Sequence, residues 1–266
     1  MSTLPRLSEN EYKLLRKLHQ KKYRDQLNLY FGEGYRLLIA AFECPTIKIG
    51  KIILLDKVTT DEQGLSIRRF ASKMRIPVFV CPEIMMRKIS DEVTPSGIFF
   101  TVEKKTYQNQ DLIAANDPVI VFLEQISEPG NLGAILRSMV WFGITNLLLS
   151  PGCVDPYNPK TIRASAGAIF ETKIYQNVPL DNAIDILKRQ GYFVLATVPE
   201  DGTPVQAGIA KNRILLLFGS EATGLSAAAL KSADGRITIP KSGPVESLNL
   251  AVAAGIFFYQ IRTQIT

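Results

Sequence analysis

The stretch Val119-Ile-Val-Phe-Leu123, followed by Asn131-Leu-Gly-Ala-Ile-Leu-Arg137, has the pattern of a buried strand that leads into a helix. An unbroken apolar run is typical of a strand buried on both faces, and Leu132, Ile135 and Leu136 recur at the spacing of one helix face. This strand-loop-helix unit predicts an α/β fold with a polar loop at the end of the strand.

Two further polar loops follow apolar strands later in the chain. Gly219-Ser-Glu-Ala-Thr-Gly-Leu225 comes after Ile214–Phe218, and Ile239-Pro-Lys-Ser-Gly-Pro-Val-Glu-Ser-Leu-Asn-Leu250 comes after a short strand. Ligands of open parallel sheets bind outside the carboxyl ends of the strands, where glycines allow close backbone approach and helix starts offer free N–H groups. The sequence therefore predicts one ligand site built from these loops.

Apolar runs alternate with helical stretches throughout the C-terminal part of the chain, which predicts a mainly parallel sheet. The predicted strands are Val119–Leu123, Asn146–Leu149, Ile169–Tyr175, Tyr192–Ala196, Ile214–Phe218 and Arg236–Ile239. The predicted helices are Leu132–Phe142, Leu180–Gln190 and Leu248–Ile261.

The N-terminal part predicts a smaller α/β sandwich. A basic amphipathic helix begins at Ser8, and a second helix covers Glu33–Phe42. The strands predicted after it are Lys51–Asp56, Pro77–Cys81 and Gly97–Val102, with helices at Glu62–Met74 and Glu83–Lys88. The polar segment from Glu103 to Asp117 has the composition of a linker.

Composition excludes several classes of protein. No apolar run approaches the roughly 20 residues that span a bilayer, and the start of the chain lacks an apolar signal core, so we expect a cytoplasmic protein. Cys44, Cys81 and Cys153 show no CxxC spacing, which argues against a disulfide framework or a zinc site. His19 is the sole histidine, so we expect neither a Ser-His-Asp triad nor a multi-histidine metal centre.

Positive charge is concentrated at the N-terminus. The net charge of the chain is +6, and the first 25 residues contain seven lysines or arginines. Such a cluster favours a polyanion, above all nucleic acid, and a solvated charged helix face is the competing interpretation.

The loop residues suggest specific roles. Asn131 is placed to cap the helix after it, and Arg137 either leans toward the sheet edge or lies on the helix surface. Ser247 is the expected N-cap of a helix so apolar that it should be buried, which leaves Asn249 as a polar group in need of a partner. The turn from Gly219 to Gly224 is a weak signal alone, and the chain contains no GxSxG, GxxxxGK[ST] or GxGxxG motif.

Taken together, the loops resemble the motifs of a known family. Asn131-x-Gly133-x-x-x-Arg137, Phe218-Gly-Ser-Glu-x-x-Gly-Leu225 and Ile239-Pro-x-x-x-x-x-Glu-Ser-Leu-Asn-Leu250 look like the three motifs of SpoU (TrmH-type) RNA 2′-O-ribose methyltransferases of the SPOUT superfamily. Asp155–Gly167 resembles the segment that this family carries between its first two motifs. The N-terminal part, with Phe31-Gly-Glu-Gly34, is similar to the family's L30e-like substrate-binding domain.

The resemblance implies a SPOUT-type sheet with a C-terminal trefoil knot, S-adenosylmethionine as cofactor, no metal, and a homodimer that methylates RNA, with ribosomal RNA favoured over transfer RNA. The implied domains are an RNA-binding domain at 1–105, a linker at 106–116 and a catalytic domain at 117–266. The implied catalytic residues are Asn131, Arg137, Glu221, Ser247 and Asn249, and the implied cofactor-binding residues are Thr197, Gly219, Glu221, Ile239 and Leu248. The implied RNA-binding residues are Lys17, Lys21, Lys22, Arg24, Lys160 and Arg163.

Three other functions are compatible with these patterns. A transfer RNA 2′-O-methyltransferase would carry the same motifs, and a non-catalytic RNA-binding or ribosome-assembly factor would keep the fold without turnover. A small-molecule nucleotide-binding enzyme fits the coarse α/β pattern, but the absent phosphate-loop and dinucleotide motifs argue against it.

Overall fold

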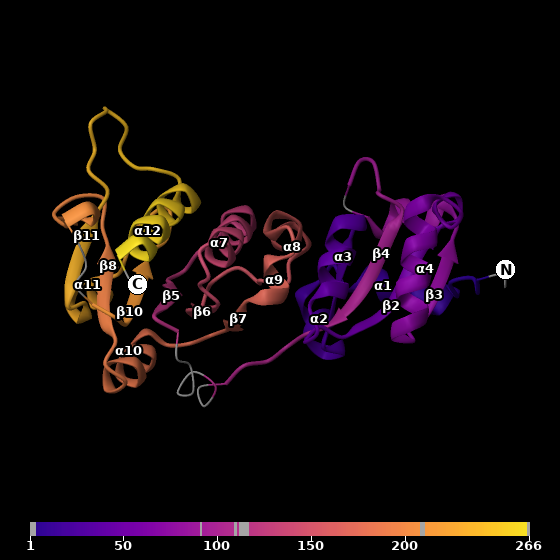
Figure 1. Ribbon diagram of the computed structural model, residues 1–266, viewed down its shortest axis with the longest axis horizontal. Helices are drawn as coiled ribbons and strands as arrows, with labels where there is room; N and C mark the ends of the chain where they lie inside the picture. Colours follow the sequence, from indigo (N-terminus) through magenta and orange to yellow (C-terminus); the bar gives the residue numbers. More distant parts are fainter. Residues whose placement is uncertain (1–3, 91, 109–110, 112–116, 208–210, 265–266) are drawn as a thin grey trace. The chain divides into compact units, whose positions relative to one another are not determined.

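The computed structural model describes residues 4–90, 92–108, 111, 117–207 and 211–264 (Figure 1). The chain forms two compact units. Unit 1 comprises Met1–Lys105 together with Tyr157–Phe170, and unit 2 comprises Thr106–Pro156 together with Glu171–Thr266. Most of the predicted linker, 106–116, lies outside the described residues.

Unit 1 is built on a four-stranded sheet of order β1-β4-β2-β3. Its strands are β1 Leu29–Glu33, β2 Ile49–Leu55, β3 Val78–Cys81 and β4 Ile98–Glu103. β4 pairs antiparallel with both β1 and β2, and β2 pairs parallel with β3. The N-terminal segment extends the β3 edge, because Val80 N–H donates to the Pro5 carbonyl at 3.0 Å and Leu7 N–H donates to the Val80 carbonyl at 2.9 Å.

The helices of unit 1 are α1 Glu9–Lys17, α2 Lys21–Leu27, α3 Tyr35–Glu43, α4 Glu62–Met74, α5 Glu83–Ile89, α8 Pro159–Ser165 and most of α9 Ala168–Glu171. α1 begins at the predicted place, because Ser8 and Glu11 form a reciprocal capping box. The helix predicted from Glu33 is wrong at its start. Leu29–Glu33 instead pairs with β4, Gly34 adopts φ +102°, and α3 begins at Tyr35.

Unit 2 contains a seven-stranded sheet of order β7-β6-β5-β10-β8-β11-β9, in which every neighbouring pair is parallel. Its strands are β5 Val119–Leu123, β6 Asn146–Leu149, β7 Lys173–Tyr175, β8 Phe193–Thr197, β9 Thr203–Pro204, β10 Ile214–Phe218 and β11 Gly235–Thr238. The prediction of a mainly parallel α/β sheet is confirmed.

One predicted strand of unit 2 is wrong over part of its length. Ile169–Tyr175 divides into the short helix α9 and the three-residue strand β7. Ala166 and Gly167 adopt φ values of 49° and 99°, which end α8 and redirect the chain before α9. Periodicity alone does not separate a short buried helix from a buried strand.

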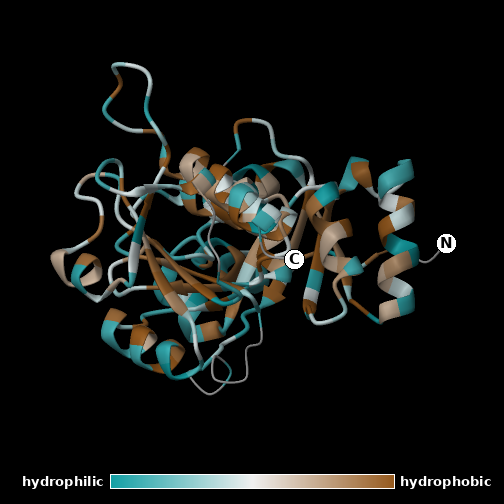
Figure 2. Ribbon diagram, turned by 60° about the vertical axis from the view of Figure 1, so that its left-hand side comes forward, coloured by the Kyte–Doolittle hydropathy of each residue, from teal (hydrophilic) through white to brown (hydrophobic). Residues whose placement is uncertain are grey.

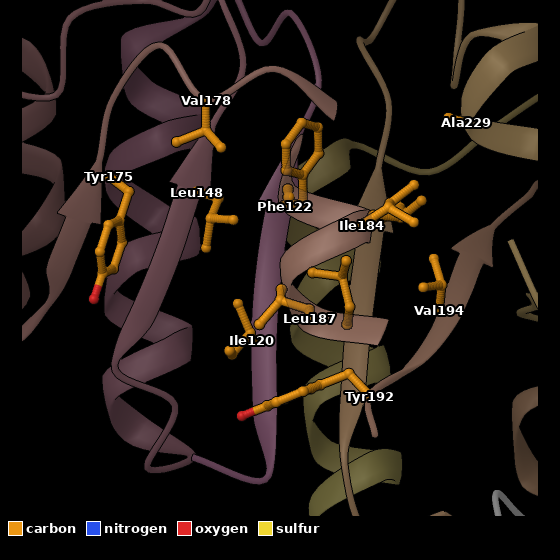
Figure 3. Packing of buried hydrophobic residues seen from close by; sticks show 13 residues of the cluster. Ile120, Phe122, Leu148, Tyr175, Val178, Ile184, Leu187, Tyr192, Val194 and Ala229 are labelled. Atoms are coloured by element: carbon orange, nitrogen blue, oxygen red, sulfur yellow. The ribbon is translucent and has the colours of Figure 1, made fainter. Parts of the chain in front are cut away.

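Helices cover both faces of the unit 2 sheet. Figure 3 shows Ile184 and Leu187 of α10 (Leu180–Arg189) over Ile120 and Phe122 of β5, within one buried cluster. The opposite face is covered by α7 (Pro129–Trp141) and α12 (Leu250–Gln264), which pack on each other. Each fully buried apolar side chain of this kind stabilises the fold by about 1.5–3 kcal/mol, so the strand ends are fixed by a large core.

The strands of the unit 2 sheet are largely apolar, whereas the helices around it contain both polar and apolar residues (Figure 2). Among the described residues, none of the helices is both long and apolar enough to pass through a membrane.

Candidate active site

The first loop ends at the start of α7, and its cap differs from the predicted one. Glu128 is the N-cap, accepts a hydrogen bond from Gly130 N–H at 3.2 Å, and Pro129 occupies the first turn. Asn131 therefore does not cap the helix. Its amide group is left to bond with the other loops from a half-buried position in the first turn.

The second loop is a tight turn that requires glycine at Gly219. Ser220 and Gly224 exchange backbone hydrogen bonds of 3.1 and 3.0 Å, and Gly224 adopts φ +67°. A Cβ on Gly219 would lie 2.0 Å from the carbonyl carbon of Gly224, far inside van der Waals contact. This close crossing holds Glu221 in an exposed position at the tip of the turn.

The third loop ends at α12, which begins two residues later than predicted. Asn249, not Ser247, caps the helix, because its side-chain oxygen accepts from the N–H groups of Ala251 at 2.9 Å and Val252 at 3.3 Å. α12 is also not fully buried, since Val252 and Tyr259 are each 53% exposed.

The three loops meet through a chain of side-chain hydrogen bonds. Asn249 Nδ2 donates to Asn131 Oδ1 at 3.0 Å, and Asn131 Nδ2 donates to Glu221 Oε1 at 2.8 Å. Asn249 is held in turn by its bonds to the start of α12, so each amide has both a donor and an acceptor partner. We call Glu221, Asn131 and Asn249 the polar triad. It joins residues separated by 90 and 118 positions in the sequence.

Arg137 and Ser247 lie outside this chain of bonds. Arg137 is exposed on α7, six residues and about 9 Å along the helix axis from Asn131. Within the described part of the chain, neither side chain forms a hydrogen bond or ion pair with the triad. The guanidinium of Arg137 is therefore available to a ligand.

The predicted cofactor-binding residues line one edge of the sheet. Thr197 ends β8, Gly219 follows β10 and Ile239 follows β11, and these strands are neighbours in the sheet. Thr197 Oγ1 donates to the Leu217 carbonyl at 2.9 Å, which ties the ends of β8 and β10 together. Leu248 is 46% exposed in the third loop. The edge thus offers backbone groups and apolar surface, with Glu221 as the carboxylate.

The predicted RNA-binding lysines of α1 and α2 surround an aromatic ring. The Lys17 and Lys22 ammonium groups lie 5.3 and 6.0 Å from the centroid of the Tyr23 ring. Lys21 pairs with Asp25 at 3.1 Å on the exposed surface. Tyr23 was not among the residues predicted from the sequence, although an aromatic residue among lysines is a recognised signal for nucleic-acid binding.

Arg24 does not fit the role predicted for it. Its side chain is 2% exposed, and its guanidinium donates to the carbonyls of Leu18 at 2.8 Å and His19 at 2.7 Å. A buried arginine that satisfies the end of α1 supports the fold and is not on the surface that meets RNA. Charge in the sequence did not distinguish it from its exposed neighbours.

The two predicted RNA-binding residues of α8 are both exposed. Arg163 forms an ion pair with Glu92, and this pair borders a pocket of about 310 Å³ that also contains Glu33. Glu33 accepts hydrogen bonds from Ser90 Oγ at 2.8 Å and Ser96 N–H at 3.1 Å. Burial nevertheless raises the pKa of Glu33 above its ordinary value, against the lowering effect of these bonds.

Models of two protein families match the chain. The SpoU rRNA Methylase family matches residues 118–259, which contain the triad and all the predicted catalytic residues. The MRM3-like substrate binding domain matches residues 9–99.

Individual relatives are similar over nearly the whole chain. An uncharacterized tRNA/rRNA methyltransferase of Synechocystis sp. is 30% identical over 95% of this chain and 90% of its own length. The 23S rRNA (guanosine(2553)-2′-O)-methyltransferase RlmP of Bacillus subtilis is 29% identical over 93% of this chain and 94% of its own length. The crystal structure of an AdoMet-bound rRNA methyltransferase from Sinorhizobium meliloti superposes with a TM-score of 0.86 at 25% identity, covering 99% of this chain and 98% of that one.

Proposed function

The chain belongs to the SpoU rRNA methylase family, and from this premise we propose that it transfers the methyl group of S-adenosylmethionine to a ribose 2′-hydroxyl of ribosomal RNA. The observation that carries the proposal is the polar triad, which draws all three family motifs to one edge of a parallel sheet. The relatives named as rRNA methyltransferases cover almost the full chain, which favours ribosomal over transfer RNA.

The strand-end edge suits S-adenosylmethionine. The cofactor is expected to lie against Thr197, Gly219, Glu221, Ile239 and Leu248, where backbone groups and apolar surface predominate. The space that a Cβ on Gly219 would fill is taken by the backbone of the turn, so this glycine shapes the wall of the site. When bound, the cofactor supplies an electrophilic methyl group on a sulfonium centre. A mostly uncharged lining suits a reaction in which positive charge is dispersed.

Arg137 is proposed to act on the RNA. Its exposed guanidinium has no partner among the described residues, and its fork of donors matches a phosphate next to the target ribose. A guanidinium stays protonated at neutral pH and is a reluctant base, so its main contribution is to hold the phosphate and stabilise the developing alkoxide. The ribose proton leaves to the adjacent phosphate, or to Arg137 in its deprotonated form.

The triad residues are proposed to position the reacting groups. Asn131 and Asn249 fix the starts of α7 and α12 relative to each other, and Glu221 anchors the second loop to them. Ser247, exposed two residues before Asn249, is proposed to orient the third loop or the ribose. Correct alignment of oxygen, methyl carbon and sulfur is worth up to about 7–11 kcal/mol of the activation barrier.

We propose residues 1–105 as the RNA substrate-binding domain, 106–116 as a linker and 117–266 as the methyltransferase domain with its C-terminal trefoil knot. The match of residues 9–99 to a substrate-binding domain supports the first part. Lys17, Lys21, Lys22 and Lys160 are proposed to contact RNA phosphates, and Arg163 is proposed to do so after release from Glu92. Arg24 is left out of this group because it is buried.

A homodimer is proposed on the outer surface of α7 and α12. These helices pack on each other and expose Trp141 at 83%, Val252 at 53% and Tyr259 at 53%. Large apolar side chains on neighbouring helices mark an interface more often than a solvated surface. Sedimentation should give a dimer mass for the wild type and a monomer mass for Val252→Asp, whereas Leu27→Asp, on unit 1, should stay dimeric.

The full chain should transfer tritiated methyl groups from S-adenosylmethionine to ribosomal RNA transcripts and yield a ribose that resists alkaline cleavage. Asn131→Ala should reduce the rate about 10²-fold, because it removes both bonds of the triad and misplaces the loops. The matched control is Asn182→Ala on α10, with no expected effect. Cofactor binding by calorimetry without any methyl transfer to RNA would refute the proposal and indicate a non-catalytic RNA-binding factor.

A further inference from the structure

A second surface of unit 1, lined by residues outside α1 and α2, has the chemistry of an RNA-binding groove. The groove has a volume of about 910 Å³ and runs between α4, the start of β3 and the N-terminal segment at Leu4 and Pro5. Its charged and hydroxyl-bearing lining residues are Ser66, Arg68, Arg69, Ser72 and Lys73.

The charge of the groove has one sign. Of the described residues that line it, three are cations and none is acidic. Arg69 and Lys73 are exposed and lie four residues apart, on the same side of α4. Neither forms an ion pair with any residue that the structure describes. Two neighbouring cations, Arg69 and Lys73, without acidic partners favour an anionic ligand.

A second pocket of unit 1 provides an internal comparison. It is lined by Glu33, Glu92 and Arg163, so acidic groups outnumber the cation, which is already paired with Glu92. Two pockets in one folded unit therefore have opposite charge, and a polyanion is drawn to the groove on α4.

An aromatic side chain completes the groove. Phe70 lines it, is 43% exposed, and stacks on Phe42 of α3 with ring centroids 5.4 Å apart and planes at 21°. Phe42 supports the Phe70 ring on one side, and part of the Phe70 ring is exposed to solvent. Single-stranded nucleic acids combine stacking of bases on such rings with phosphate contacts from neighbouring cations.

We propose that this groove binds a single-stranded segment of the RNA substrate, with Arg69 and Lys73 on its phosphates and Phe70 against a base. Ser66 and Ser72 are placed to donate hydrogen bonds to phosphate oxygens. This inference rests on the proposed function for the identity of the RNA, but the groove contributes affinity and not chemistry.

The test compares two double variants of the full chain that each remove two exposed lysines or arginines from unit 1. Arg69→Ala/Lys73→Ala alters the groove, and Lys57→Ala/Lys88→Ala lowers the net charge equally outside it. The probe is a fluorescent single-stranded RNA oligonucleotide, titrated at several salt concentrations. The groove variant should bind about tenfold more weakly, with a slope of log K against log salt smaller by about 1.4, because each single-strand phosphate contact contributes roughly 0.7.

Further measurements separate the groove from the active site and from misfolding. Phe70→Ala should weaken binding of the oligonucleotide about tenfold without changing the salt slope, and Arg69→Lys/Lys73→Arg should restore most of the affinity. In methyl transfer the groove variant should show a raised KM for RNA, an unchanged kcat and unchanged affinity for S-adenosylmethionine. Equal RNA binding by the groove and control variants would overturn this inference and leave the proposed function intact. Absence of methyl transfer by the wild type, with the RNA-binding difference retained, would refute the function and leave the groove.

Discussion

The two units of this protein solve different problems with polar residues. In unit 2 the triad of Glu221, Asn131 and Asn249 is joined by bonds of 2.8 and 3.0 Å at a sheet edge fixed by a buried core. In unit 1, Lys17 and Lys22 lie on exposed helices and touch little besides the Tyr23 ring. Methyl transfer requires that the reacting groups are held in fixed positions. Binding of a polyanion requires only positive charge, which mobile lysine side chains can supply. Single substitutions at the site in unit 2 should therefore greatly reduce the rate of methylation, whereas substitutions of the lysines in unit 1 should weaken RNA binding in small steps.

Substitution of Arg137 should have the largest effect on methylation. Arg137→Ala should lower single-turnover methylation by about 10²- to 10⁴-fold, because the alkoxide and adjacent phosphate lose their cation at the moment of reaction. Affinity for S-adenosylmethionine, measured by calorimetry, should not change. Arg189→Ala, an exposed arginine on α10, is the matched control and should methylate normally. Near-normal turnover by Arg137→Lys would contradict the assignment, since lysine keeps the charge and loses the fork.

Gly219 tests whether the site depends on backbone geometry. Gly219→Ala places a Cβ 2.0 Å from the Gly224 carbonyl carbon, so the turn must open. We expect cofactor affinity to fall at least tenfold and the protein to lose about 1–3 kcal/mol of stability, the usual cost of overpacking. Gly243→Ala in the third loop is the control, because nothing lies within 4 Å of its Cβ. Equal calorimetric affinities for the two variants would show that the second loop does not shape the cofactor site.

Substitutions of the lysines on α1 and α2 should weaken RNA binding moderately. Lys17→Ala/Lys22→Ala should weaken RNA binding about tenfold and lower the salt slope by about 1.4, with cofactor affinity and kcat unchanged. Lys173→Ala/Lys231→Ala makes the same change in charge on exposed positions of unit 2 and should alter neither quantity. An unchanged salt slope in the first variant would assign these lysines to a solvated helix face.

The fold was predictable where hydrophobic pattern and local caps agree. Val119–Leu123 and Ile214–Phe218 are strands with the bounds predicted, because a run buried on both faces has few alternatives. β1 was missed because Leu29–Glu33 is a strand only through its pairing with β4, a partner some 70 residues away. Short segments are decided by tertiary contacts that a local pattern does not contain.

The sequence predicted which residues form the site but not the hydrogen bonds between them. The motifs named Asn131, Glu221 and Asn249, but the order of their hydrogen bonds depends on how three loops converge. Both caps were assigned to the wrong residue. Glu128, three residues before Asn131, caps α7, and Asn249, two residues after Ser247, caps α12. In unit 1, Arg24 shows that charge alone does not identify an RNA-binding residue. Its charge is the same as that of its neighbours, and only its burial reveals its structural role.

Glu33 offers the smallest effect and the finest test of the contrast, because it is a half-buried carboxylate of unit 1 that accepts hydrogen bonds from Ser90 and Ser96. Burial raises its pKa, so the stability that it contributes is present below its unfolded pKa and is lost as pH rises through the folded value. Glu33→Gln does not titrate and keeps an acceptor for Ser90 and Ser96. The free energy of unfolding of Glu33→Gln minus that of the wild type, both measured in urea, should therefore be larger at pH 7 than at pH 4.5. Glu83→Gln is the matched control of opposite sign, since the hydrogen bond from Arg87 lowers the pKa of Glu83 and its contribution is lost as pH falls. If the wild type instead became more stable relative to Glu33→Gln as pH rises, the carboxylate of Glu33 would be stabilised in its charged form. Unit 1 would then contain an acidic site organised like the one in unit 2.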